Sequence, residues 1–263
     1  MTGLPPPAPT LLDRLDLALA HQIVQAADIG EHELLASAQG YHDGLFRRNP
    51  RDPHFLAALL RQRGFAVWDD DAIEVLAGNN RRLPATSQEH HLLHGLSDAL
   101  QMIRERGSQG LLPDGWFMTE VFRVATRGIA RFRNNTIRSD EPWDAILNVS
   151  HPPAAELSAI LDTFNHENRY RDHQALFDAM HPLRQGFRIL WRFVRIAPFP
   201  DLNGMMGWLA MCSWLLAKGY PLLSPEASDR ELVKRMAGGP PPNRCVQWEA
   251  RLLDSLQRRR VSA

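Results

Sequence analysis

The sequence predicts a mainly α-helical protein, and two observations lead to that fold class. Apolar residues recur at helical spacing in most segments, beginning with Leu12, Leu15, Leu19 and Ile23. Strand signals, such as strict alternation of apolar and polar residues, are scarce throughout the chain. With 263 residues, of which 44% are hydrophobic, the chain is long enough to bury a full core.

The apolar pattern, read with the turn residues between its segments, places helices along the chain. Residues 1–10 are Pro-rich and are expected to form a flexible tail. Helices are expected at 11–27, 33–37, 53–63, 84–104, 112–126, 152–165, 183–195, 205–218 and 244–258. The clearest helix end is at Lys218-Gly219, which is followed by Pro221. We divide the chain into an N-terminal helical extension (11–68), a central domain (69–225) and C-terminal helices (226–263).

The composition argues against nucleic acid and membranes as partners. Lys plus Arg and Asp plus Glu number 30 each, so the chain has no overall charge to attract a polyanion. No apolar run approaches the ~20 residues that a membrane helix needs. The first ten residues lack the features of a secretion signal. Because there are only two cysteines, Cys212 and Cys245, we expect a reducing compartment and a cytoplasmic protein.

The turn between the expected helices at 183–195 and 205–218 is the most informative stretch. Residues 196–211 read I-A-P-F-P-D-L-N-G-M-M-G-W-L-A-M. Pro198 and Pro200 prevent a continuous helix, and Asn203-Gly204 tolerates the positive φ of a tight turn. Asp201 and Asn203 lie among apolar residues. A carboxylate and an amide in an otherwise apolar turn indicate a candidate site.

This turn resembles the signature loop of the Fic (Fido) family, H-x-F-x-[DE]-G-N-G-R-x-x-R. Four residues match the loop: Phe199, Asp201, Asn203 and Gly204. Four others differ at important positions. Ala197 replaces the catalytic histidine, Leu202 the first glycine, Met205 the first arginine and Trp208 the second. The resemblance implies a Fic-like helical domain whose loop has kept its frame and lost its reactive groups.

A second resemblance lies within residues 71–80. Many Fic proteins carry an inhibitory segment of the type [ST]-x-x-x-E-[GN], and here Ala77 stands at the glutamate, followed by Gly78 and Asn79. The family's inhibitory glutamate pairs with the second loop arginine, where Trp208 stands. The joint change leaves no charge without its partner. The alternative is that Gly78-Asn79 simply ends a helix.

A third resemblance, at 130–133, suggests the target-binding flap of Fic enzymes. The sequence A-R-F-R resembles the family's G-x-[FY]-R, which precedes the flap. We therefore expect an extended segment at 134–139 and a short β-hairpin flap at 141–149, which in Fic enzymes aligns the target by strand addition. Arg133 is the candidate residue here, with a plain surface arginine as the alternative.

Two groups of histidines have structural interpretations that we prefer. His90 and His94 are spaced for a metal pair, but no third ligand is evident, so ordinary helix histidines are favoured. His181, before Pro182, is interpreted as a helix start. We expect no metal site, with Asp201 as a weak candidate only.

In Fic enzymes the histidine takes a proton from a target hydroxyl, the acidic residue holds Mg²⁺, and the arginines hold the phosphates of ATP. Alanine cannot act as a base, a function typically worth ~10²–10⁴-fold in rate. The expected function is therefore binding of a protein, a paralogue or a small ligand, without AMP transfer and without a cofactor. We expect an apolar pocket narrowed by Met205, Met206 and Trp208, and a homo-oligomer is possible.

Two alternatives stay open. One is a transferase that uses ATP and Mg²⁺ with a substitute base, for which His181, Asp201 and His151 are the candidates. A cationic cleft containing Arg133 or Arg195 would favour it. The other is a structural subunit that silences an active paralogue.

Overall fold

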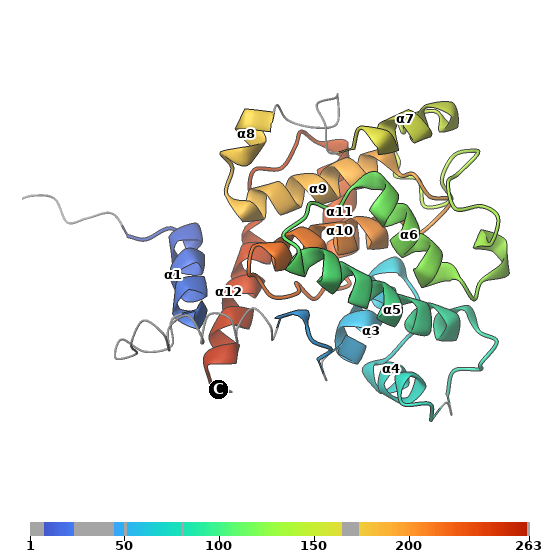
Figure 1. The fold of residues 1–263 in the computed structure, drawn as a ribbon, viewed down its shortest axis with the longest axis horizontal. Helices are drawn as coiled ribbons and strands as arrows, with labels where there is room; N and C mark the ends of the chain where they lie inside the picture. The colour runs from blue at the N-terminus through green and yellow to red at the C-terminus, as the bar shows by residue number, and fades with distance from the viewer. Residues whose placement is uncertain (1–7, 24–44, 50–51, 80–81, 165–173, 262–263) are drawn as a thin grey trace, which may run out of the picture.

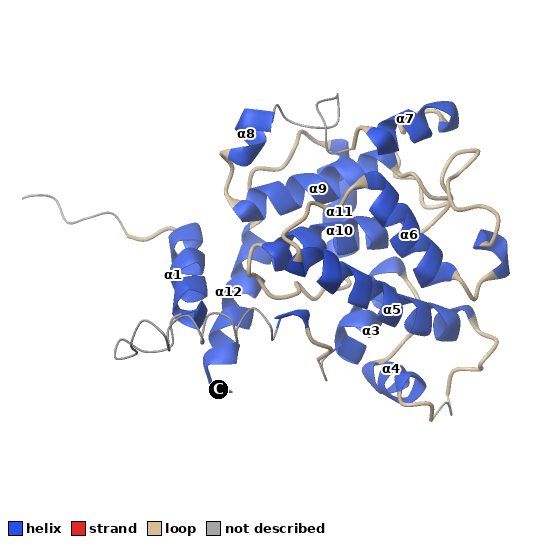
Figure 2. Ribbon diagram, viewed as in Figure 1, coloured by secondary structure: helices blue, strands red, loops and turns tan. Residues whose placement is uncertain are grey.

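A computed structural model describes residues 8–23, 45–49, 52–79, 82–164 and 174–261. Its helices are α1 (Leu11–Ile23), α3 (Asp52–Arg63), α4 (Asp69–Leu76), α5 (Gln88–Ser108), α6 (Gly115–Thr126), α7 (Leu157–Asp162), α8 (Gln174–Asp178), α9 (Pro182–Ile196), α10 (Asn203–Ala217), α11 (Asp229–Gly238) and α12 (Val246–Val261). Two 3₁₀ turns, η1 (Ala130–Phe132) and η2 (Ala154–Glu156), lie between α6 and α7. The expected mainly helical class is confirmed (Figure 2).

Helix α10 is the centre of the fold, because nearly all of its residues are buried. It packs against α9 along its length and against α5, α3 and α6 on other sides (Figure 1). A Cβ on Gly207 would lie 2.9 Å from Leu190 Cδ1, so glycine permits the close approach of α9 and α10. Helix α11 lies against α9, and α1 against α12 near the two ends of the chain. The loop before α10 is thereby held by several helices.

Local sequence explains where the helices around α10 begin. The side chain of Ser87 accepts a hydrogen bond from the His90 amide, and that of Asp114 from the Phe117 amide, which are ordinary N-terminal caps. His181 caps α9 by accepting from the Leu183 amide at 3.2 Å, with Pro182 in the first helical position. The interpretation of His181 as a helix start is confirmed.

The expected β-hairpin flap is wrong: the described residues contain no strand, and 134–149 form turns and loop. The physical reason is that the backbone amides of this segment donate to another part of the chain. The amides of Arg138 and Trp143 donate to the carbonyls of Pro198 and Pro200, at 3.0 and 2.7 Å. The segment therefore makes long-range backbone hydrogen bonds with the loop before α10 and forms only local turns within itself.

Other boundaries agree to within a few residues. The helix expected at 33–37 and the last four residues of that at 11–27 lie outside the described residues. The helix expected at 152–165 is shorter, since α7 ends at Asp162. Both α11 and α12 lie within the expected C-terminal helical region. In the described part of the chain, no helix is long and apolar enough to cross a membrane.

Candidate functional site

The loop between α9 and α10 turns by means of two residues with left-handed backbone. Ala197 ends α9 with φ 44°, and Leu202 precedes α10 with φ 67°. This conformation costs an L-residue roughly 1–2 kcal/mol, and glycine usually takes it. Both side chains are nearly fully buried, at 2% and 0% exposure, so burial offsets the strain. Leu202 thus has a backbone conformation that glycine adopts without steric cost.

The Asn203 side chain holds this turn together. Its Oδ1 accepts from the Phe199 amide and its Nδ2 donates to the Phe199 carbonyl, both at 2.9 Å. The Phe199 ring in turn stacks on Phe122, with 4.2 Å between ring centroids. These two residues fix the loop conformation. Gly204 borders the cavity described below, and a Cβ added to it would meet no atom within 4 Å.

Asp201 is engaged by arginines from two separate segments. Its Oδ1 accepts from Arg63 Nε at 3.1 Å and from Arg63 Nη2 at 2.7 Å, and also from the Leu202 amide at 2.7 Å. Arg131 Nη2 lies 3.4 Å from Oδ2. The carboxylate is buried. Oδ1 is saturated by these donors, and two guanidinium groups beside the carboxylate repel a divalent cation, so the surroundings do not suit Mg²⁺. Among the described residues, no cluster of three metal-ligating side chains occurs.

The N-terminus of α10 also has an internal anion. Asp144 Oδ2 accepts from the Asn203 amide and its Oδ1 from Asn203 Nδ2, both at 2.7 Å. Burial raises the pKa of Asp144, and the nearby charge of Asp201 adds to this, while the bonds from Asn203 act in the opposite direction. Free amides at a helix start favour an anion. Here the protein supplies that anion from the 134–149 segment.

Arg138 anchors the same segment to the end of α9. Its buried guanidinium donates to the carbonyls of Ala197, at 2.6 Å, and Pro152, at 2.5 Å. A cation that binds the last carbonyls of a helix suits the helix dipole. Arg133, the candidate from the sequence, is exposed at the end of η1. The arginines that reach the loop are therefore Arg63, Arg131 and Arg138.

A cavity of about 230 Å³ lies beside the loop. Its apolar side consists of Ile146, Val194, Ala197, Met205 and Val233. Its charged and polar lining includes Arg63, Asp144, His151, Arg230 and Lys234. Neither Arg133 nor Arg195 is part of the lining. The expectation of an apolar pocket is therefore wrong, because charged side chains from α11 and the 134–149 segment line one side of the cavity.

His151 lines this cavity, and both of its ring nitrogens have a backbone partner. Its Nδ1 lies 3.0 Å from the Arg195 carbonyl, which can only accept, so Nδ1 carries the proton. Its Nε2 is then the acceptor of a long hydrogen bond of 3.5 Å from the Ile146 amide. The arrangement holds the imidazole in one orientation against the end of α9.

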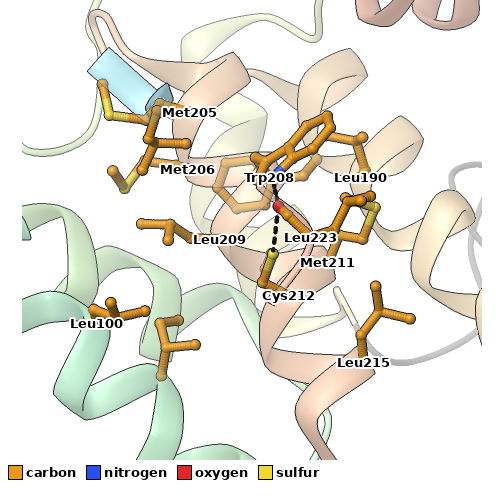
Figure 3. Close-up of a cluster of buried hydrophobic side chains, with 14 of the residues drawn as sticks. Leu100, Leu190, Met205, Met206, Trp208, Leu209, Met211, Cys212, Leu215 and Leu223 are labelled. Carbon is orange, nitrogen blue, oxygen red and sulfur yellow. Dashed lines mark hydrogen bonds between the residues drawn. The ribbon is translucent and has the colours of Figure 1, made fainter. Parts of the chain in front are cut away.

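Of the three residues expected to narrow the pocket, only Met205 does so. Met206 and Trp208 are buried in the core beneath the loop (Figure 3). Trp208 Nε1 donates to the Leu223 carbonyl at 2.8 Å, and its ring meets Trp248 edge-on. The expectation that Trp208 narrows the pocket is therefore wrong, because its indole finds its partner inside the core.

The segment that resembles the inhibitory motif ends α4 and is exposed at Ala77, Gly78 and Asn79. Gly78 has φ 77°, and the Asn79 amide donates to the Glu74 carbonyl at 2.8 Å, which is a common helix ending. Trp208 is fully buried, whereas Ala77 is exposed. The geometry here is that of the simpler alternative, a helix C-cap.

Sequence reasoning missed the charged partners of the loop, which are Arg63, Arg131, Arg138 and Asp144, and the two cations of the cavity, Arg230 and Lys234. Arg63 lies 138 residues before Asp201, so no local pattern connects the two. Of these residues only Lys234 stands out in the sequence, because the chain has lysine only at positions 218 and 234.

No family model and no curated protein matches the sequence. Solved structures do match. A Fic-domain-containing signalling protein from Bacteroides thetaiotaomicron is 14% identical, with 95% of this chain and 92% of that one covered and a TM-score of 0.61. A Fic family protein from Desulfovibrio desulfuricans is 16% identical, with 99% and 77% covered and a TM-score of 0.59. Fic-1 from C. elegans is 16% identical, with 96% and 84% covered and a TM-score of 0.59. The chain therefore has the Fic fold.

Proposed function

We propose that this protein is a Fic-fold binding protein that does not transfer AMP. The observation that carries the proposal is the state of the loop carboxylate. Asp201, which stands at the metal-binding position of the Fic loop, already accepts two charge-assisted hydrogen bonds from Arg63. A metal ion at Oδ1 would have to displace Arg63, and at either oxygen it would be repelled by the guanidinium groups of Arg63 and Arg131.

Two further features support the same function. Ala197 stands where the Fic loop has its histidine, and a methyl group cannot accept a proton. Asp144 binds the first amide of α10, so a phosphate approaching that helix start would meet a carboxylate. The base, the metal and the phosphate each lack a suitable site in this loop.

The experiment is incubation of the protein with ATP and Mg²⁺, alone and with candidate protein targets, followed by intact-mass analysis. An active Fic adenylyltransferase serves as the positive control. We expect no mass increase on this chain or on the targets. A reproducible adduct of one AMP, absent when ATP is omitted, would refute the proposal.

A transferase with a substitute base is the second candidate, and His151 is the residue that favours it. This residue lines a cavity that also contains Arg230 and Lys234, and its Nε2 makes only a long bond of 3.5 Å with the Ile146 amide. His181 is less suitable, because it caps α9 and its Nε2 lies 2.9 Å from Asp16. Adduct formation that is lost in His151→Gln and retained in His181→Gln would support this candidate over the first.

Binding to a protein partner or to an active paralogue is part of the proposal. Trp143 and Leu147, in the segment over the cavity, are exposed at 55% and 88%. Affinity purification of the tagged chain from its native cells, compared with a Trp143→Ala, Leu147→Ser variant, tests this surface. Loss of the same co-purified protein in the variant is the expected result, and unchanged recovery would contradict it.

A further inference from the structure

The cavity beside the loop has one apolar wall and one charged wall. The apolar wall comes from the end of α9, the start of α10 and α11, through Val194, Met205 and Val233. The charged wall comes mainly from Arg230 and Lys234, which are four residues apart on α11 and so share a face of that helix. A ligand that fills this space needs an apolar body and a negatively charged end.

The charges around the cavity suit a single negative charge. Arg63 is neutralised by Asp201, and Asp144 offsets one of the two remaining cations. Arg230 makes no ion pair within the described residues. Its guanidinium lies close to Gly64, since a Cβ added there would be 3.3 Å from Nη1. Lys234 pairs with Glu231 at 2.8 Å, but both side chains are exposed. Exposed pairs of this kind are weak, so a ligand anion can replace Glu231.

The position of Asp144 decides where that anion lies. Because its carboxylate already binds the Asn203 amide, a second anion at the α10 N-terminus would be repelled. The favourable position is on the opposite side, beside Arg230 and Lys234. A triphosphate would carry several negative charges towards Asp144, whereas a monoanion can keep its charge at α11 and its body against the apolar wall.

The size of the cavity limits the ligand. Its volume of about 230 Å³ lies below the ~300–1,000 Å³ of pockets for drug-sized ligands. At ~30 Å³ per water molecule, it has room for the volume of roughly eight waters. The cavity therefore suits a ligand of roughly eight non-hydrogen atoms, such as hexanoate.

We propose that this cavity binds a small organic monocarboxylate, with the carboxylate at Arg230 and Lys234 and the hydrocarbon part against Val194, Met205 and Val233. This inference rests on the proposed function, since it takes the cavity to be free of nucleotide.

The test is calorimetric titration of the full chain with hexanoate, acetate, hexanol and hexylamine. Hexanoate is expected to bind at least tenfold more tightly than hexanol or hexylamine, because only hexanoate pairs with the α11 cations. Acetate is expected to bind on the order of 100-fold more weakly, since it lacks four of the buried methylene groups. Equal binding of hexanoate and hexylamine, or no binding of hexanoate, would overturn the inference.

Matched variants on α11 separate the site from general charge effects. Arg230→Gln and Lys234→Gln are each expected to weaken hexanoate binding about tenfold, the loss of one charge-assisted hydrogen bond. Arg235→Gln removes the same charge from an exposed position on the same helix that does not line the cavity, and should leave binding unchanged. Equal effects of all three variants would contradict the site. The adduct experiment is independent: absence of AMP transfer together with absence of hexanoate binding refutes this inference alone.

Discussion

The ion pair between Arg63 and Asp201 can be tested by removing one partner. In Arg63→Ala, Asp201 stays buried with the Leu202 amide and a distant Arg131 as its remaining donors. Breaking a fully buried pair costs ~3–5 kcal/mol. The Arg63 side chain is 27% exposed, so water replaces part of the lost interaction. We therefore expect a loss of about 2–3 kcal/mol in the free energy of unfolding, measured by urea denaturation.

A matched control lies two residues away on the same helix. Arg61 pairs with Asp69 at 2.7 Å, but these side chains are 33% and 43% exposed. Arg61→Ala should therefore cost less than about 1 kcal/mol. The double variant Arg63→Ala, Asp201→Asn should lose about 1–2 kcal/mol less unfolding free energy than the sum of its two single changes. The reason is that neither charge of the pair is left buried without its partner. Equal losses in Arg63→Ala and Arg61→Ala, with additive effects in the double variant, would refute the reasoning.

Three other predictions concern the loop and the core. The Leu202→Gly variant should unfold at the same or a higher urea concentration than Leu202→Ala, because glycine adopts a φ of 67° without strain. A glycine variant less stable than the alanine variant would show that the backbone at this position is not strained. Asp144 has a raised pKa, so the folded protein binds this proton more tightly than the unfolded one. The stability of the wild type relative to Asp144→Ala should therefore increase as the pH falls from 7 towards the usual value of 3.8, and a decrease would reverse the assigned direction. Burial raises the pKa of Cys212 to about 12, so thiol reagents should label it only after unfolding, and rapid labelling of the native protein at pH 8 would argue against this packing.

Much of the helical core could be predicted from the sequence, because helices follow from local spacing. The stripe from Leu12 to Ile23 predicted α1, and the limits of α9 and α10 were correct to within two residues. Short helices were harder: α8 has five residues, too few for a periodic pattern to stand out. The prediction of a flap failed because it assumed that the segment after η1 pairs with itself.

The site was predicted in part. Phe199, Asp201, Asn203 and Gly204 do form one turn, as the resemblance implied. What could not be read from the sequence is which groups meet them. Asp144 and Arg63 are 59 and 138 residues from their partners in the loop, and both look like ordinary charged residues of a turn and a helix end. Under the proposed function these partners matter most, because Arg63 and Asp144 bind groups of the loop that a metal and a phosphate would otherwise approach.

The most direct test of this account is calorimetric titration of the full chain with ATP in the presence of Mg²⁺. Since Arg63 and Asp144 satisfy the polar groups of the loop within the chain, we predict no binding at millimolar ATP. Binding in the micromolar range that is lost in Asp201→Asn would show that the loop still holds a metal and a nucleotide, and would contradict the account.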